Sequence, residues 1–519
     1  MRIMLCKKIL ALALTGALLS CGGGGDVEVA SAGAAARTAA SVFRSPLTAA
    51  PIVAGQTQIT LVSDAGDYVG AGQSFAYTQA DAVITVRAEG GHLRVTVGGD
   101  EQWTGDFELP APHEVFDVNE YLGVTRYPFH QPEVGGLNWG GGGRGCGPLA
   151  GSFRINSSEY AGAELVAIDL DFVQQCEGAT GALHGNIRWF ASDSTSPPRP
   201  VRAIPSTLWS PLPGTTPSGG TFVHLASSSV GDPIGAGIRA TYTPRNAQVA
   251  VAEFGGHLTV SVIGDERWSG DFQVMAGVAR LRPGWYPALK RHPVHNPTKG
   301  GMYWSGERRS CSQVEAWFVV DEVTYVDGEL ATLDMRFQQH CEWAGAPALN
   351  GRIRWDINDR TGPALPRRAA LDRLWQPAPG APIPATGNYV YLYSEPGDFV
   401  GGGMHGSYSS GISVGSSGST VSVSTNGYSG TFIGMSSIPR LRRGYYPNLQ
   451  STSGYNPARG GMLWSTLMRR CWEIKGWFAI DHIRYDSVGS IIELDMRFMQ
   501  SCEGTQPPLR GAIHWVRPS

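Results

Sequence analysis

Leu333–Trp355 reads LDMRFQQHCEWAGAPALNGRIRW, and this stretch decides the fold of the chain. Its first half alternates two kinds of side chain. The first kind, apolar except for one glutamine and one cysteine, is Leu333, Met335, Phe337, Gln339 and Cys341. The second kind, which is polar, is Asp334, Arg336, Gln338 and His340. A period of two predicts a half-buried β-strand, and the same alternation after a short loop predicts a second one.

This stretch occurs three times in the chain. The other copies are Ile168–Trp189 (IDLDFVQQCEGATGALHGNIRW) and Leu494–Trp515 (LDMRFMQSCEGTQPPLRGAIHW). Matching sequence continues on both sides of each copy. Repetition on this scale predicts one module used three times, and 519 residues also exceed what a single hydrophobic core supports.

The repeats divide the chain into seven segments. These are a signal peptide (1–21), a tether expected to be flexible (22–57), module 1 (58–191), a linker (192–220), module 2 (221–357), a second linker (358–386) and module 3 (387–519). Both linkers are rich in Pro and Arg, yet each contains Leu-Trp-x-Pro, at Leu208–Pro211 and Leu374–Pro377. A free linker rarely needs a tryptophan, so we expect each linker to dock on a neighbouring module.

Each module is expected to be all-β. The 69 glycines and 34 prolines of the chain fall between strand-like runs, and no segment combines strong helical periodicity with helix caps. The pattern predicts an antiparallel β-sandwich with Greek-key or jelly-roll connections. An immunoglobulin-like topology is the alternative, although the cysteine spacing and the tryptophan positions do not match that fold.

The N-terminal segment has the composition of a bacterial export signal. It begins with basic residues, and Ile9–Ser20 is apolar or small but too short to span a bilayer. Its last four residues, Leu-Leu-Ser-Cys at Leu18–Cys21, resemble the lipobox of bacterial lipoproteins. The resemblance implies that Cys21 becomes the lipidated N-terminus, and Gly22 in place of Asp favours the outer membrane. An ordinary cleaved signal peptide with an incidental cysteine is the alternative.

The remaining cysteines fall into one pair in each module. The chain has eight cysteines, and two of them, Cys6 and Cys21, lie in the N-terminal segment. The other six form pairs at nearly equal separations: Cys146 and Cys176, Cys311 and Cys341, and Cys471 and Cys502. A zinc site would require clustered ligands, and no CxxC or HxxxH spacing is present. We therefore predict one disulfide within each module, which places the protein in an oxidising compartment.

The sequence around these cysteines follows a pattern: GRGC, then CEGG, then L-x-G-x-I-x-W. Gly143–Cys146 and Cys176–Gly178 fit it, whereas module 2 departs at Trp343 and module 3 at Met468–Arg470. In this pattern the chain resembles a repeat of uncharacterised exported bacterial proteins, where it is often found in tandem. The resemblance covers residues 58–190, 221–356 and 389–516. It implies an exported β-module and carries no activity that could be transferred.

Composition and motifs argue against two classes of function. Charged residues make up only 16% of the chain and the net charge is −3, so nucleic acid is not an expected partner. Nucleophile, zinc-protease and P-loop motifs are absent, and Asp169 and Asp171 fall on the outward face of a strand. No catalytic residue, cofactor or metal site is therefore predicted. Asp67, repeated as Asp232 and Asp398, is expected to shape a turn, with a calcium ligand as the alternative.

A tandem binding or adhesion module is the favoured function, a structural spacer is the alternative, and a carbohydrate-active enzyme is least favoured. Aromatic side chains can stack on sugar rings, and several copies would gain avidity for a polymer. The candidate ligand-binding residues are Trp139, Arg144, Glu177, Tyr286, Trp304, Arg309, Glu342, Tyr446, Trp464, Arg469 and Glu503. The expected partners are the membrane, through the lipid, and a glycan or an envelope protein.

Two contacts near the disulfides are also predicted. The inward-facing glutamines Gln174, Gln339 and Gln500 should be buried and should bond to backbone beside the disulfide, because a buried amide requires partners. The arginine two residues before the first cysteine and the glutamate directly after the second cysteine should form an ion pair once the disulfide joins them.

Overall fold

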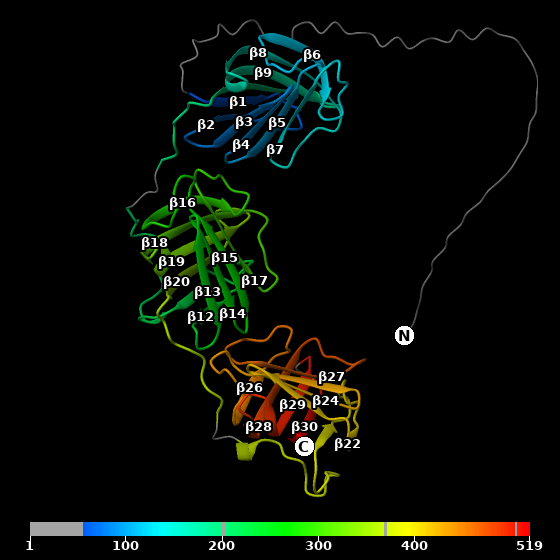
Figure 1. The fold of residues 1–519 in the computed structure, drawn as a ribbon. Coiled ribbons are helices and arrows are strands. Elements are labelled where there is room, and N and C mark those ends of the chain that lie inside the picture. Colours follow the sequence, from blue (N-terminus) through cyan, green and yellow to red (C-terminus); the bar gives the residue numbers. More distant parts are fainter. Residues whose placement is uncertain (1–55, 199–202, 368–370, 504–505, 519) are drawn as a thin grey trace, which may run out of the picture. The chain divides into compact units, whose positions relative to one another are not determined.

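The computed structural model of the chain describes residues 56–198, 203–367, 371–503 and 506–518. The signal peptide, Cys21 and all but the last two residues of the tether lie outside these residues. The described chain is all-β, as expected (Figure 1). Its one helical element is a single 3-10 turn, Leu371–Arg373, in the second linker.

Module 1 contains ten strands. In chain order they are β1 (Gln58–Ser63), β2 (Ser74–Thr78), β3 (Val83–Glu89), β4 (His92–Gly98), β5 (Gln102–Glu108), β6 (Asn119–Arg126), β7 (Gly136–Gly141), β8 (Leu149–Ala161), β9 (Glu164–Cys176) and β10 (Leu183–Phe190). The alternating run of the repeated stretch is β9, and L-x-G-x-I-x-W is β10.

Modules 2 and 3 repeat these ten strands. Those of module 2 are β11 (Phe222–Ser227), β12 (Arg239–Tyr242), β13 (Gln248–Phe254), β14 (His257–Ile263), β15 (Arg267–Gln273), β16 (Gly284–Arg291), β17 (Gly301–Gly306), β18 (Val314–Val326), β19 (Glu329–Cys341) and β20 (Ala348–Asp356). Those of module 3 are β21 (Tyr389–Ser394), β22 (His405–Tyr408), β23 (Ser413–Ser417), β24 (Thr420–Thr425), β25 (Tyr428–Ile433), β26 (Gly444–Leu449), β27 (Gly461–Thr466), β28 (Ile474–Tyr485), β29 (Ile491–Cys502) and β30 (Leu509–Val516).

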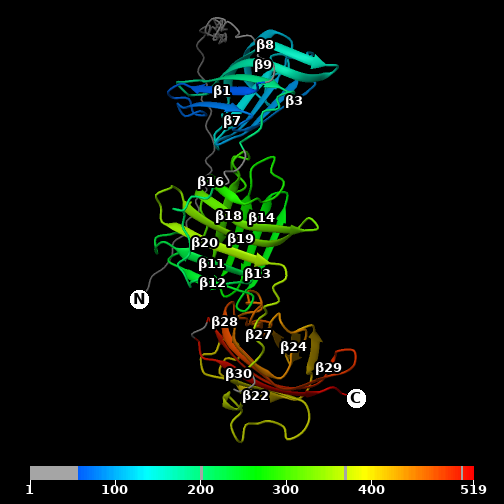
Figure 2. The same cartoon turned by 90° about the vertical axis from the view of Figure 1, so that its left-hand side faces the viewer.

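The strands of each module form two packed layers. In module 1 the hydrogen-bonded order is β2-β1-β10-β9-β8-β6-β7-β5-β4-β3, and module 2 has the same order. The pairing of β6 with β7 is short and parallel, whereas the other strand pairs of the module are antiparallel. The sheet folds at this pair, so that β3, β4, β5 and β7 form the second layer (Figures 1 and 2). In module 3 the equivalent strands, β26 and β27, belong to separate sheets, one of six strands and one of four.

The connections combine local hairpins with one pairing between the two ends of each module. Strands that are consecutive in the chain mostly pair, as β3-β4-β5 and β8-β9-β10 do, and the first strand pairs with the last. In module 1 the strands at the edges of this order are β2 and β3. Alternation could not reveal this, because a period of two shows which face of a strand is buried but not which strand lies beside it.

An aromatic core lies between the two layers of each module. In module 1 the Phe107 ring meets the Phe153 and Phe172 rings edge to face, with centroids 5.6 and 5.5 Å apart. The glycine of L-x-G-x-I-x-W provides the space for this packing. A Cβ atom on Gly185 would lie 2.0 Å from the Phe172 ring, and Gly351 and Gly511 face equivalent phenylalanines at similar distances. These glycines are therefore required by packing.

The turns that contain Asp67, Asp232 and Asp398 are structural, as expected. The buried carboxylate of Asp67 accepts hydrogen bonds from the Val69 and Gly70 amides and from the Ser63 hydroxyl. Equivalent bonds recur in the other two modules. Because these oxygens already accept donors, the alternative of a calcium ligand has no support in the structure.

Each module contains the predicted disulfide. Cys146 and Cys176, Cys311 and Cys341, and Cys471 and Cys502 are bonded, with Cα atoms 5.1 to 5.3 Å apart. Three structural disulfides indicate an oxidising environment of the kind that exported proteins meet. None of the helices in the described part of the chain is long and apolar enough to cross a membrane.

Candidate functional site

The disulfide of each module lies beside a buried glutamine that joins the two layers. Gln174 on β9 accepts a hydrogen bond from the Trp139 amide at 2.7 Å and donates one to the Trp139 carbonyl at 2.8 Å. Its Nε2 also lies 3.4 Å from the Cys146 sulfur. Gln339 and Gln500 make the same contacts. The prediction that these amides are buried and bond to backbone beside the disulfide is confirmed.

The tryptophans expected to be ligand platforms are core residues instead. Trp139, Trp304 and Trp464 are fully buried on β7, β17 and β27, and each ring packs on a phenylalanine of the repeated stretch. Tyr286 and Tyr446 are also buried, and their hydroxyls donate to the backbone carbonyls of Arg282 and Arg442. No sugar ring can reach these five side chains. The sequence interpretation is wrong for them because their glycine- and proline-rich surroundings form strands rather than exposed loops.

The ion pair predicted across each disulfide is also wrong. Arg144 Nε donates instead to the Val69 carbonyl at 2.7 Å, and Glu342 accepts a hydrogen bond from the Ser312 amide at 2.8 Å. The prediction rested on the short distance between the two bridged cysteines. Glu342 and Glu503 have φ values of 69° and 51°, so the chain turns at this residue.

The three arginines make other contacts in place of this ion pair. Arg144 connects the loop before the first cysteine to the turn that contains Asp67. Arg469 contacts the equivalent turn of module 3 at Gly402, and Arg309 lies over the Trp268 ring, 5.5 Å from its centroid. Glu177, Glu342 and Glu503 remain exposed on the other side of the disulfide. Arg144 and Arg469 thus position this loop, and the glutamates stay available to solvent.

Two exposed tryptophans that the candidate set omitted lie directly beside the disulfides. Trp343 follows Cys341 by two residues and is 63% exposed, and Trp472 follows Cys471 and is 86% exposed. A sequence signal for both exists, because the other modules have Gly or Ser at these positions. An aromatic residue where the other repeats have a small one is not required by the shared core.

Trp472 borders a groove in the part of the chain that the structure describes. This groove has a volume of about 1130 Å³. Its walls include Tyr445 and Trp477 of module 3, and also Lys475 and Glu503. Tyr445 and Trp477 contact each other edge to face, with ring centroids 5.8 Å apart. Aromatic faces beside charged and hydrogen-bonding groups are the usual lining of sites for polar ring-shaped ligands.

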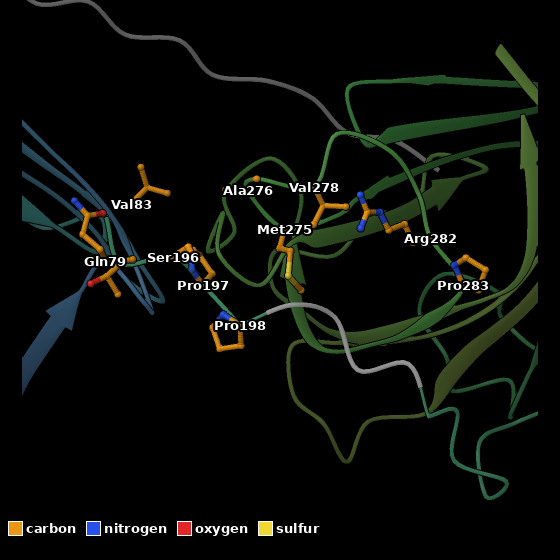
Figure 3. A pocket seen from close by; sticks show the side chains of 13 residues that line it. Gln79, Val83, Ser196, Pro197, Pro198, Met275, Ala276, Val278, Arg282 and Pro283 are labelled. Carbon is orange, nitrogen blue, oxygen red and sulfur yellow. The ribbon is translucent and has the colours of Figure 1, made fainter. Parts of the chain in front are cut away.

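A second cavity, of about 360 Å³, is lined mainly by backbone and small side chains (Figure 3). Gln79 and Val83 come from module 1, Ser196–Pro198 from the first linker, and Met275 and Arg282 from module 2. It contains one charged group and no cluster of titratable side chains, so it offers less chemistry than the groove at Trp472.

Loops of modules 2 and 3 make matching contacts with the preceding module. Asn296 Nδ2 donates to the Asp100 carboxylate at 3.0 Å, and Asn456 Nδ2 donates to the Asp265 carboxylate at 3.0 Å. Ion pairs of Lys299 and Arg459 with these same carboxylates accompany them. At the position of Asn296, module 1 has Gln131.

The linkers dock on the module that follows them, as expected. In module 2 the Arg336 guanidinium forms a two-pronged ion pair with Asp321 and donates to the Trp209 carbonyl at 2.8 Å and the Ser210 hydroxyl at 2.7 Å. A planar guanidinium can make all these bonds at once because its donors point in fixed directions.

Module 3 repeats this docking with a more buried arginine. Arg497 pairs with Asp481 and donates to the carbonyls of Leu371 and Trp375. The Trp375 ring stacks on Tyr391, with centroids 6.5 Å apart. Module 1 has Asp171 at the position of this arginine, where it accepts hydrogen bonds from Asn156 and Asn186. Two of the three modules are therefore built to hold a linker through an arginine.

Replacing Arg336 with alanine should release the first linker. The variant loses two hydrogen bonds from a charged donor, worth about 1.5–3 kcal/mol each when geometry is good, so we expect chymotryptic cleavage after Trp209 to accelerate roughly tenfold or more. Mass spectrometry of the cleavage products under native conditions measures the rate of cleavage after Trp209. Arg308→Ala, at an exposed position of the same module, is the control. Equal rates in the two variants would show that Arg336 does not hold the linker.

No family model, no curated protein and no solved structure matches the chain in comparisons with known proteins.

Proposed function

We propose that the chain is an exported envelope protein, held in the membrane by a lipid on Cys21, whose modules bind a glycan or another surface polymer. The outer membrane is the favoured location, on the basis of the lipobox and Gly22. The modules act as binding units and carry no catalytic residues in this proposal.

The observation that carries the proposal is the exposure of Trp343 and Trp472 beside the disulfides. A tryptophan ring in water is stabilised when a ligand covers it, so an exposed tryptophan on a rigid support suits a ligand contact. The disulfide at Cys341 and the turn at Glu342 fix the chain directly before Trp343. Glu342 directly precedes Trp343 in the chain, and Glu503 lines the same groove as Trp472. Both carboxylates can accept hydrogen bonds from sugar hydroxyls.

The presence of two exposed tryptophans supports a polymeric target. Each exposed tryptophan offers only a small contact, and the affinity of one such contact is low. Two contacts on one chain raise the effective concentration of the second after the first has formed. A polymer with a repeating unit can use both contacts, whereas a small molecule cannot.

Docked linkers favour the second candidate, a spacer that needs no ligand. Arg336 and Arg497 hold the linkers against modules 2 and 3, and Asn296 and Asn456 connect consecutive modules. Such contacts restrict the freedom of one module relative to the next, which suits a protein that keeps a partner at a distance from the membrane.

A glycan array probed with the exported chain tests the binding function. We expect retention on a subset of glycans, and the double variant Trp343→Ala, Trp472→Ala should weaken it roughly 30-fold, the effect of a dominant contact residue at about 2 kcal/mol. The melting temperature should stay constant because both side chains are exposed. Phe254→Ala, which removes another exposed ring of module 2, is the control. An array without bound glycans would favour the spacer.

A further inference from the structure

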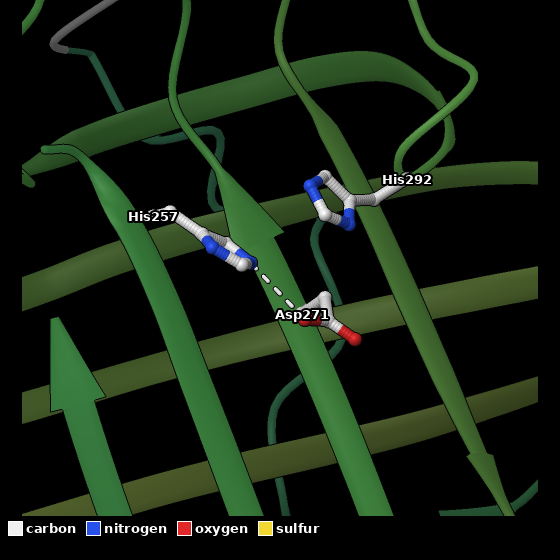
Figure 4. Close-up of side chains that lie close together, drawn as sticks. All are labelled: His257, Asp271 and His292. Atoms are coloured by element: carbon white, nitrogen blue, oxygen red, sulfur yellow. Dashed lines mark hydrogen bonds and ion pairs between the residues drawn. The ribbon is translucent and has the colours of Figure 1, made fainter. Parts of the chain in front are cut away.

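Three side chains on the outer face of the smaller layer of module 2 form a group with the chemistry of a metal site (Figure 4). His257 is the first residue of β14, Asp271 lies on β15, and His292 directly follows β16. One nitrogen or oxygen atom of each lies within 4.8 Å of those of the other two. The sequence indicates no such site, because these residues come from two strands and from the loop after a third strand, and they have no motif spacing.

Strand pairing brings the group together. Thr259 is the partner of Asp271 in the register of β14 and β15, so His257 is the diagonal neighbour of Asp271 on the same face. His257 Nε2 and Asp271 Oδ1 lie 3.0 Å apart. The His292 ring stacks on the His257 ring, with centroids 4.5 Å apart. The side chains of His257 and Asp271 are about one-third exposed, so an ion can reach them from solvent.

Module 1 has the same arrangement with one difference. His92 Nε2 and Asp106 Oδ1 lie 3.1 Å apart, and the ring stacked on His92 is that of Tyr127, at 4.6 Å. Module 2 therefore has an imidazole where module 1 has a phenol, on the same backbone. In module 1 a tyrosine ring stacks on the first histidine equally closely, so this packing does not require a histidine. The histidine of module 2 therefore adds a nitrogen donor beyond what packing needs. Thr420 and Thr431 replace the first histidine and the aspartate in module 3.

We propose that His257, Asp271 and His292 bind one divalent transition-metal ion, for which zinc is the best match. Two imidazole nitrogens and one carboxylate oxygen are common zinc ligands, with bonds of about 2.0–2.2 Å. Because His257 and Asp271 are hydrogen-bonded to each other without the ion, this bond has to open when the ion binds. A three-residue site leaves a coordination position for water or for a ligand. The site is separate from the tryptophans of the proposed function and does not depend on them.

Zinc titration of the full chain, purified without a polyhistidine tag and treated with a chelator, tests the proposal by calorimetry near neutral pH. We expect one zinc ion per chain. His292→Tyr, which reproduces the arrangement of module 1, should weaken binding roughly 100-fold. His113→Ala removes an exposed histidine of module 1 and should leave the affinity unchanged. Zinc should raise the melting temperature of the parent chain but not that of His292→Tyr.

Two further variants keep the test decisive if His292→Tyr folds poorly. Asp271→Asn keeps the shape of the side chain and should also weaken zinc binding. Tyr127→His completes the same three ligands in module 1 and should raise the stoichiometry to two ions per chain. Cobalt, used in place of zinc, should give the visible absorption of a site with nitrogen and oxygen ligands. Absence of zinc binding to the parent chain, or equal affinity in His292→Tyr, would overturn the proposal.

Discussion

Replacing both Cys311 and Cys341 with alanine should lower the free energy of unfolding of module 2 by about 3–4 kcal/mol. The disulfide closes a loop over a sequence separation of 30 residues, and its loss gives the unfolded chain back the entropy of that loop. Removal of the disulfide should also expose to solvent the hydrogen bonds between the Gln339 side chain and the Trp304 backbone. Hydrogen exchange measured by mass spectrometry resolves the effect, because peptides from modules 1 and 3 serve as internal references.

The equivalent double replacement at Cys146 and Cys176 is the matched control. It should accelerate exchange in module 1 and leave module 2 unchanged. A loss of protection spread equally over all three modules would contradict the independent cores seen in the structure. Unchanged protection of module 2 in the Cys311 and Cys341 variant would show that the disulfide does not stabilise the module.

Gln174→Leu should destabilise module 1 by about 2–4 kcal/mol, although leucine matches the apolar surroundings. The variant leaves the Trp139 amide and carbonyl buried without their partners, and each unsatisfied group costs about 1–3 kcal/mol. Chemical denaturation followed by tryptophan fluorescence and by exchange of module 1 peptides measures the change.

Gln175→Leu is the control for Gln174→Leu, because Gln175 is the next residue of β9 and its side chain is exposed. This substitution should change the stability of module 1 by less than about 0.5 kcal/mol. Equal effects of the two variants would show that the amide of Gln174 makes no special contribution between the layers.

The sequence by itself determined which face of each strand is buried. Alternation in the repeated stretch placed Phe337, Gln339 and Cys341 inward, and the structure agrees. Repetition then determined the disulfides, because one pair of cysteines recurred at nearly the same separation in every copy. It also indicated that the linkers dock, through a tryptophan that an unattached segment would not need. These are local or repeated features, and local features depend on the chemistry of neighbouring residues in the chain.

Only the tertiary structure decided where the functional candidates lie. Trp139 follows two glycines and looked like a loop residue, but β7 pairs with β5 and carries it into the core. In modules 2 and 3 the glutamate turns away from the arginine near the disulfide, because Glu342 and Glu503 adopt a left-handed backbone conformation. His257, Asp271 and His292 meet only because strand register brings three distant segments together. A period of two specifies the faces of a strand, but the neighbours of a side chain depend on which strands pair and in which register.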